Sequence, residues 1–112
     1  MEVKVEKEGG VLVVSPIGKL DGENGVLLEQ TLMPDITGTN NKVAMNMENV
    51  NGVTNDGIRG LLTLIQRATM MRGQLVLYNA SESFIQVLQQ SGLDSFFTVV
   101  GDKNEVFERL GG

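Results

Sequence analysis

The chain has 112 residues, enough for one domain with a conventional hydrophobic core. It contains no Cys and no His, which excludes disulfides, thiolate metal sites and catalytic sites built on His or Cys. The net charge is −5, and its 9 basic residues are scattered, so nucleic-acid binding is disfavoured. No apolar run approaches the roughly 18 residues that span a bilayer, and the start lacks a signal-peptide core. We therefore expect one cytoplasmic domain over residues 1–112, without membrane insertion.

The first predicted element is a β-hairpin. Val3 and Val5 alternate with charged residues, which is the period of a half-buried strand. After a Gly-Gly turn, residues 11–15 form a second apolar strand. Pro16 is expected to limit that strand, because proline donates no hydrogen bond to a sheet ladder.

A helix is predicted next, with Asp21 as its N-cap and Pro34 at its end. Its apolar stripe is expected to comprise Val26, Leu27, Gln30, Thr31 and Met33. The polar residues 35–42 read as a loop, and the short apolar run 43–47 predicts a buried strand.

The longest periodic segment follows a short polar turn at residues 50–57. Three- and four-residue spacings predict an amphipathic helix whose buried face comprises Ile58, Leu61, Leu62, Ile65, Ala68 and Thr69. Gly73 is expected to end it. Thr54, Asn55 and Asp56 are all residue types that cap helix N-termini, where an acidic side chain, or a phosphate, also suits the helix dipole. This turn is therefore the first place to look for function.

The remaining elements alternate between strand and helix. Residues 75–78 predict a buried strand, Ser81 or Ser83 caps a helix that ends at Gly92, residues 96–100 predict a strand, and residues 104–110 a helix. The whole order predicts an α/β fold with a mixed, mostly parallel sheet, an N-terminal hairpin near one edge and about four helices. In such sheets, functional loops lie at the carboxyl ends of strands, and residues 50–56 form such a loop.

The segment Val43-Ala-Met-Asn-Met-Glu-Asn-Val-Asn-Gly-Val-Thr-Asn-Asp-Gly-Ile58 resembles the signature of STAS domains, the anti-sigma-factor antagonist family. That signature is a strand with a central Asp, a Val four residues later, and Asp-Ser-Ser-Gly-Leu at the start of a helix. Supporting matches lie at residues 18–21, 72–77 and 88–96, in the family's order. The resemblance implies a single STAS-like domain.

In the family, the Ser before the helix-opening Gly is phosphorylated by a partner's kinase, which releases the antagonist from the anti-sigma factor. The resemblance places Asp56 at that position, with Asn55 for the first Ser, Thr54 for the motif's Asp and Asn46 for the strand Asp. Asp56 supplies about one negative charge where phosphoserine supplies roughly 1.5 to 2. Either the chain permanently resembles the phosphorylated state, or its partner has adapted to Asp56.

The resemblance thus implies a regulatory protein, not an enzyme, that docks on an anti-sigma factor or a serine-kinase-like protein, as a monomer or weak homodimer without cofactor or metal. Met70 lies off the apolar stripe, where it suits an adaptable contact. The expected docking surface lies near Asp21 and comprises Thr54, Asn55, Asp56, Gly57, Arg59, Thr63, Gln66 and Met70. The alternative is an accessory subunit of a lipid-transport ATPase complex or of a stress-signalling assembly.

Two enzyme-like interpretations compete with docking. Asp21 and Asp56 could form an acid/base or magnesium pair, although helix capping explains each of them without chemistry. The glycines around residues 52–57 suggest a phosphate loop, but their spacing fits no nucleotide-binding fingerprint.

Overall fold

The structure is a computed structural model that describes residues 1–111. Within that range one sheet contains six strands, with β1 to β6 bounded as follows: Glu2–Glu8, Val11–Leu20, Lys42–Asn46, Val50–Val53, Gln74–Tyr78 and Thr98–Val100. The main path is β1-β2-β3-β5-β6, and β4 pairs with β2 beside it. β1 and β2 are antiparallel, and the other pairs are parallel. The predicted α/β fold, with its hairpin at one edge, is confirmed.

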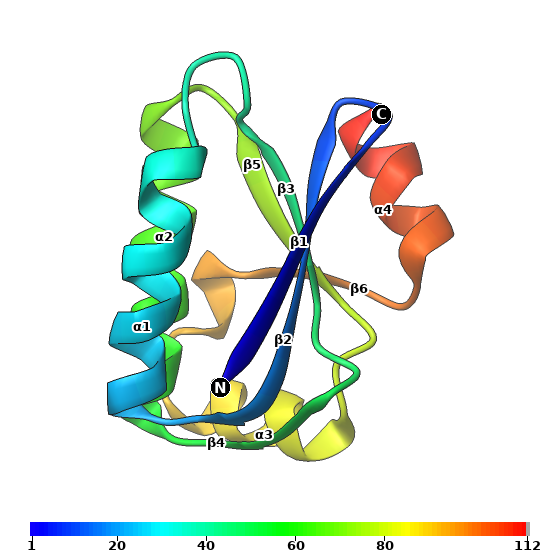
Figure 1. Ribbon diagram of the computed structural model, residues 1–112. Coiled ribbons are helices and arrows are strands. Elements are labelled where there is room, and N and C mark those ends of the chain that lie inside the picture. The colour runs from blue at the N-terminus through cyan, green and yellow to red at the C-terminus, as the bar shows by residue number, and fades with distance from the viewer. Residues whose placement is uncertain (112) are drawn as a thin grey trace.

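The helices lie on both faces of the sheet (Figure 1). α1 and α2 lie side by side on one face, and α4 covers the other. The larger core packs α1, α2 and α3 against the sheet, and the smaller core lies beneath α4. None of the helices in residues 1–111 is long and apolar enough to cross a bilayer. The bounds of α1 to α4 are Gly22–Leu32, Asn55–Met70, Glu82–Gln90 and Lys103–Leu110, and short 3₁₀ helices span Met33–Asp35 and Asp94–Phe96.

Strand β2 continues past Pro16 to Leu20, further than the predicted residues 11–15, although its ladder with β3 ends at Val14, before Pro16. β2 pairs with β3 before this point, at residues 12–14, and with β4 after it, at residues 18–20. Pro16 lies between the two stretches, so neither β3 nor β4 requires a hydrogen bond from its missing N–H. The long strand brings Leu20 to the carboxyl end of the sheet, next to the start of α2.

Residues 50–53 were expected to be a loop, but they form strand β4. Their run of four residues contains Asn and Gly, which are poor strand formers, so local propensity gives no strand signal. Pairing with the carboxyl end of β2 forms the strand instead, and the Thr54 N–H donates to the Leu20 carbonyl at 3.0 Å. The turn before α2 is therefore anchored to the sheet.

Helix α1 turns a different face to the core from the predicted one. Leu28 and Leu32 are fully buried, whereas Val26 and Leu27 are 50% and 40% exposed. The reason is the close approach of α1 to α2: a Cβ on Gly60 would lie 2.9 Å from the Gly25 Cα. Contact through these small residues sets the rotation of α1 about its axis.

The buried face of α2 also differs in detail from the predicted stripe. Leu64 is fully buried, although the prediction omitted it, while Leu62 and Ile65 are partly buried and Thr69 is exposed. Ile58, Leu61 and Ala68 are buried as predicted. The stripe is centred further towards α1 than the apolar pattern indicated.

Two boundaries near the sheet's other end also differ from the predicted ones. Arg72, not Gly73, adopts the left-handed conformation after α2, with φ of 64°. Gly73 packs against Asn41, and a Cβ there would overlap the Asn41 carbonyl oxygen. β6 begins at Thr98 because residues 94–96 form a 3₁₀ helix, so Phe96 stays exposed.

Candidate docking site at the start of helix α2

The start of α2 is built on Thr54. Its Oγ1 accepts a hydrogen bond from the Gly57 N–H at 3.2 Å, which makes Thr54 the N-cap. Asn55 and Asp56 are the first two residues of the helix itself. The interpretation of Asp56 as an N-cap is therefore wrong, although its carboxylate still lies in the first turn, where the helix dipole favours it.

The Asp56 side chain projects into solvent. It is 75% exposed, and its nearest basic group, the Arg59 guanidinium, lies 4.0 Å away and is equally exposed. An exposed pair of this kind contributes little to stability. The fold therefore leaves the negative charge of Asp56 largely available to another molecule.

Gly57, in contrast, is buried. A Cβ at this position would overlap the Leu20 carbonyl oxygen at the end of β2. Because Gly57 has no side chain, the first turn of α2 can approach the sheet. Gly57 therefore positions the neighbouring Asp56 and offers no side chain of its own to a partner.

The other predicted docking residues of α2 lie along one side of the helix. Positions 56, 59, 63, 66 and 70 follow one another at steps of three and four residues, so they share a face. Arg59, Gln66 and Met70 are exposed, Met70 by 74%. Thr63 is half-buried, and its hydroxyl donates to the Arg59 carbonyl at 3.2 Å. Together with exposed Asn55, these five residues are called the α2 stripe below.

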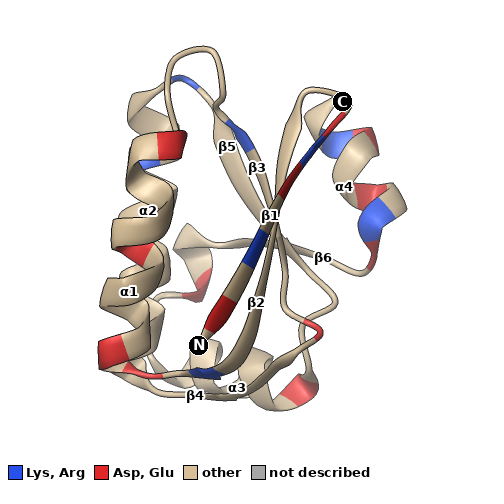
Figure 2. Ribbon diagram, viewed as in Figure 1, with Lys and Arg blue, Asp and Glu red and all other residues tan. Residues whose placement is uncertain are grey.

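The start of α1 lies beside the start of α2. A Cβ on Gly22 would lie 3.1 Å from the Asp56 Cβ, so the two helix starts are in contact. Asp21 caps α1 as predicted, because its Oδ1 accepts the Asn24 N–H at 2.9 Å. Figure 2 shows acidic residues at this start of α1. Among residues 1–111, no three acidic side chains gather closely enough to hold a metal ion.

The sequence-based prediction missed two contributors to this region. Val26 and Leu27 add exposed apolar surface on α1, since the glycine contact with α2 rotates them outward. Asn46, which the sequence resemblance aligns with the family's strand Asp, organises the loop after β3. Its Oδ1 accepts hydrogen bonds from the Glu48 N–H at 3.1 Å and from the Asn79 side-chain amide at 3.2 Å. The sequence pointed only to Asn46, through the resemblance to the family, and gave no indication that Val26 and Leu27 face solvent.

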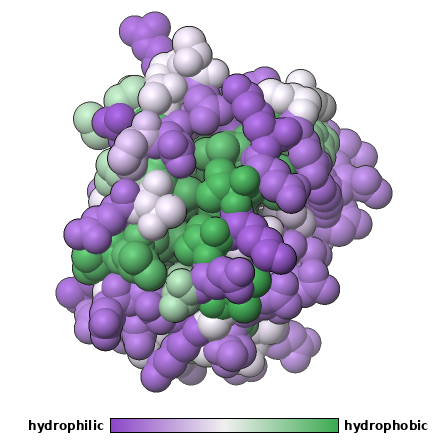
Figure 3. Space-filling model, in the orientation of Figure 1, coloured by the Kyte–Doolittle hydropathy of each residue, from purple (hydrophilic) through white to green (hydrophobic). Residues whose placement is uncertain are grey.

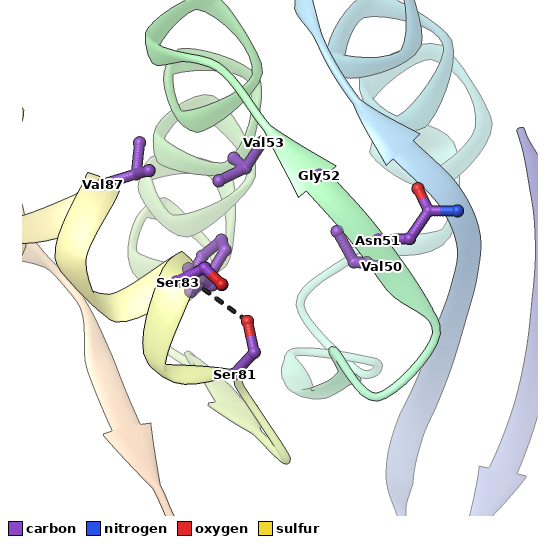
Figure 4. Close-up of a pocket in the computed structure, with 8 residues that line it drawn as sticks. Val50, Asn51, Gly52, Val53, Ser81, Ser83 and Val87 are labelled. Carbon is purple, nitrogen blue, oxygen red and sulfur yellow. Dashed lines mark hydrogen bonds between the residues drawn. The ribbon is translucent and has the colours of Figure 1, made fainter.

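A cavity of about 350 Å³ lies between β4 and α3 (Figure 4). Ser81 caps α3 here by accepting the Phe84 N–H at 3.1 Å, which confirms one of the two predicted caps. None of the predicted docking residues lines the cavity. Its walls comprise Val50, Asn51, Gly52, Val53, Ser81, Ser83, Phe84 and Val87.

The different roles of Thr54 and Asp56 can be tested by unfolding. Thr54→Ala is expected to cost about 1 kcal/mol of the free energy of unfolding, because the Gly57 N–H loses its acceptor. Asp56→Ala is expected to cost less than about 0.5 kcal/mol, since it removes only a dipole interaction and an exposed ion pair. Urea titrations measure both, with Thr54→Ser as a control that keeps the cap. Equal losses for the two Ala variants would contradict the assignment.

Comparison with solved structures places this geometry among known proteins. A proposed anti-sigma factor antagonist from Thermotoga maritima has a TM-score of 0.86 at 17% identity, covering 98% of this chain and 95% of that one. SpoIIAA, a Bacillus cell fate determinant, has a TM-score of 0.80 in its unphosphorylated form at 18% identity, covering 99% and 98%. RsbS of Moorella thermoacetica, in a variant with Glu in place of one Ser, has a TM-score of 0.82 at 18% identity, covering 99% and 96%.

The TM-scores show a shared fold, and at identities of 17% and 18% these matches show nothing beyond the fold. A search of curated proteins found no match. The family comparison is decisive, because a model of the STAS domain matches residues 2–110, nearly the whole length of the chain. Together with the hairpin-edged sheet and the capped turn before α2, this match shows that the chain belongs to the STAS domain family.

Proposed function

We propose that this protein is an anti-sigma-factor antagonist-like regulator that acts by docking on another protein and catalyses no reaction. The observation that carries the proposal is the exposed Asp56 carboxylate. The sequence resemblance aligns Asp56 with the phosphorylated Ser of the family, and this alignment is part of the proposal. Asp56 lies at one end of the α2 stripe, whose side chains are exposed except for half-buried Thr63, and such a face resembles an interaction surface more than a reaction site. Several structural relatives are described as anti-sigma factor antagonists.

Asp56 gives this surface a permanent negative charge. No strong interaction within the described residues neutralises this charge, because Thr54 is the N-cap of α2 and the contact with Arg59 is long and exposed. A carboxylate carries less charge and fewer acceptor oxygens than a phosphoserine, so it mimics one only in part. We infer that the protein docks constitutively, without a phosphoryl switch at this position.

The exposed side chains of α1 extend the proposed surface. Val26 and Leu27 add apolar area on the helix that contacts the start of α2, and Met70 adds another apolar side chain at the far end of the stripe. A specific interface needs on the order of 800 Å² per partner, usually with an apolar centre and a polar rim. Two adjacent helices with exposed residues of both kinds meet that description.

The partner can be identified by cross-linking from the surface. A photo-reactive amino acid at exposed Gln66 is expected to capture an anti-sigma factor or serine-kinase-like protein in the native cell. The same probe at Glu108, an exposed residue of α4 on the opposite face of the sheet, serves as the control. Capture of transport ATPase subunits from Gln66 would favour the accessory-subunit alternative. Identical products from both positions would exclude the α2 stripe as the docking surface.

Restoring the family's Ser tests the link to a phosphoryl switch. With the captured partner and ATP, Asp56→Ser is expected to incorporate phosphate on the new hydroxyl, and its affinity for the partner is expected to change when it does, because a phosphoryl group adds roughly 1.5 to 2 negative charges at the interface. Wild type and Asp56→Ala provide the controls and should remain unmodified. If Asp56→Ser is neither modified nor changed in affinity, descent from a phosphoryl switch is wrong for this partner. Mass spectrometry and a binding titration measure the two quantities.

A further inference from the structure

The outer edge of β1 is the longest unpaired strand edge among residues 1–111. β1 comprises seven residues without Gly or Pro, and its strand partner is β2 alone. The opposite end of the sheet is β6, which has three residues. Short edge strands and edge prolines are common protections against strand addition, and β1 has neither; its protection is the charge of its Lys and Glu side chains, which favours only a strand of complementary charge. The free N–H and C=O groups of β1 can therefore receive such a strand.

The two faces of β1 differ in character. Val5 pairs with Val14, whose side chain belongs to the core beneath α1 and α2, so Val3, Val5 and Lys7 lie on that face. Lys4, Glu6 and Glu8 lie on the α4 face, where Lys103 of α4 forms an ion pair with Glu8 at 2.8 Å. Val5 is 38% exposed. Figure 3 shows apolar surface in the region between α1 and β1.

The charges along β1 complement one another when the strand is reversed. In an antiparallel pair of two β1 strands centred on Val5, each Lys4 lies opposite Glu6 of the other copy. Val5 then lies opposite Val5. Moving the centre to residue 4 or 6 instead places Lys4 opposite Lys4, or Glu6 opposite Glu6, and like charges directly opposite are destabilising.

The ends of the strand are compatible with the same register. Glu2 lies opposite Glu8 of the other copy, which by itself would be repulsive. Glu8, however, is already paired with Lys103, which offsets its charge. The Val5 register also includes all of Glu2–Glu8, so it forms the greatest number of interstrand contacts that the edge allows.

We propose that two copies of this chain associate through antiparallel pairing of their β1 strands, around a two-fold axis at Val5. The interface is isologous, as in most homodimers. The two sheets become one continuous sheet, with Lys4 bound to Glu6 on both sides of the axis. No residue of the α2 stripe takes part, so the dimer is independent of the proposed function and would present that surface twice.

Charge reversal tests the register. Wild-type protein is expected to change from 12.1 kDa towards about twice that mass as its concentration rises in sedimentation velocity. Lys4→Glu places two acidic pairs across the axis, and Glu6→Lys places two basic pairs there. Each variant alone is expected to raise the dissociation constant at least about tenfold, because two attractive pairs become repulsive.

Mixing the two variants provides the decisive measurement. The Lys4→Glu copy is acidic at both positions and the Glu6→Lys copy is basic at both, so both cross-strand pairs between positions 4 and 6 are attractive. The mixture is therefore expected to dimerise at least as well as wild type. A folding defect could not produce this recovery. Glu108→Lys, on exposed surface of α4, is the control and should dimerise like wild type.

The proposal is overturned if wild type remains monomeric up to about 1 mM. A dissociation constant above this concentration corresponds to a binding free energy weaker than about −4 kcal/mol. The proposal is also overturned if either variant alone dimerises like wild type, or if the mixture fails to recover. Far-UV circular dichroism of each variant confirms that the fold is intact before the comparison.

Discussion

Replacing Gly57 by Ala is expected to destabilise the protein by about 3 kcal/mol, because overpacking a closely packed site has costs of this order. The added Cβ would overlap the Leu20 carbonyl oxygen, a backbone atom held by its hydrogen bond to Thr54. Backbone at the junction of β2 and β4 cannot move away without disturbing the pairing of these strands. Relief would require α2 to shift away from the sheet.

A destabilising effect of Gly57→Ala would distinguish this close contact from an ordinary helical position. Gly to Ala within a helix ordinarily stabilises a protein by up to about 1 kcal/mol, because Gly has the lower helix propensity. Gly38 serves as the matched control, since an added Cβ there meets no atom within 4 Å, and Gly38→Ala should change stability by less than about 0.5 kcal/mol. Urea unfolding followed by circular dichroism measures both. A neutral or stabilising Gly57→Ala would contradict the close contact between α2 and Leu20.

Replacing the neighbouring Asp56 by Lys is expected to have the opposite profile, with a large effect on docking and a small one on folding. Reversal of an exposed charge within the proposed interface should weaken binding to the captured partner by about tenfold or more. The loss of folding stability should stay below about 1 kcal/mol, since it reflects the helix dipole and one exposed ion pair.

Glu108→Lys on α4 makes the same change in net charge far from the α2 stripe and controls for general electrostatic attraction. Titration calorimetry or surface plasmon resonance measures the affinities at a stated salt concentration, because charge effects depend on screening. Equal losses for the two reversals would show that net charge, and not the α2 stripe, determines binding. An unchanged affinity for Asp56→Lys would exclude Asp56 from the interface.

The contrast between Gly57 and Asp56 separates two roles within one turn. Gly57 is buried and lets α2 approach the sheet, whereas Asp56 is 75% exposed. Their substitutions should therefore act on different measurements, stability for Gly57 and affinity for Asp56. This separation makes the proposed function testable without confusing a lost partner contact with a lost fold.

Where the sequence predicted correctly, local chemistry was sufficient. The element order, the edge hairpin and the caps Asp21 and Ser81 follow from periodicity and from side chains that bond within three residues of themselves. The exposure of Met70 follows in the same way, because it lies off the apolar stripe of α2. The family pattern then pointed to Asp56, and no local signal distinguished it from a capping residue.

The amino-acid sequence by itself determined which segments become strands or helices over most of the chain, because those preferences depend on neighbours along the chain. Tertiary structure alone decided that β2 passes Pro16, that residues 50–53 pair with it, and that Val26 and Leu27 face solvent. Each of these depends on a contact between segments distant in sequence: the change of strand partner at Pro16, the bond from Thr54 to Leu20, and the approach of Gly60 to Gly25. Backbone contacts of this kind have no periodic signature, since they depend on the absence of a side chain or a hydrogen bond and not on hydrophobicity.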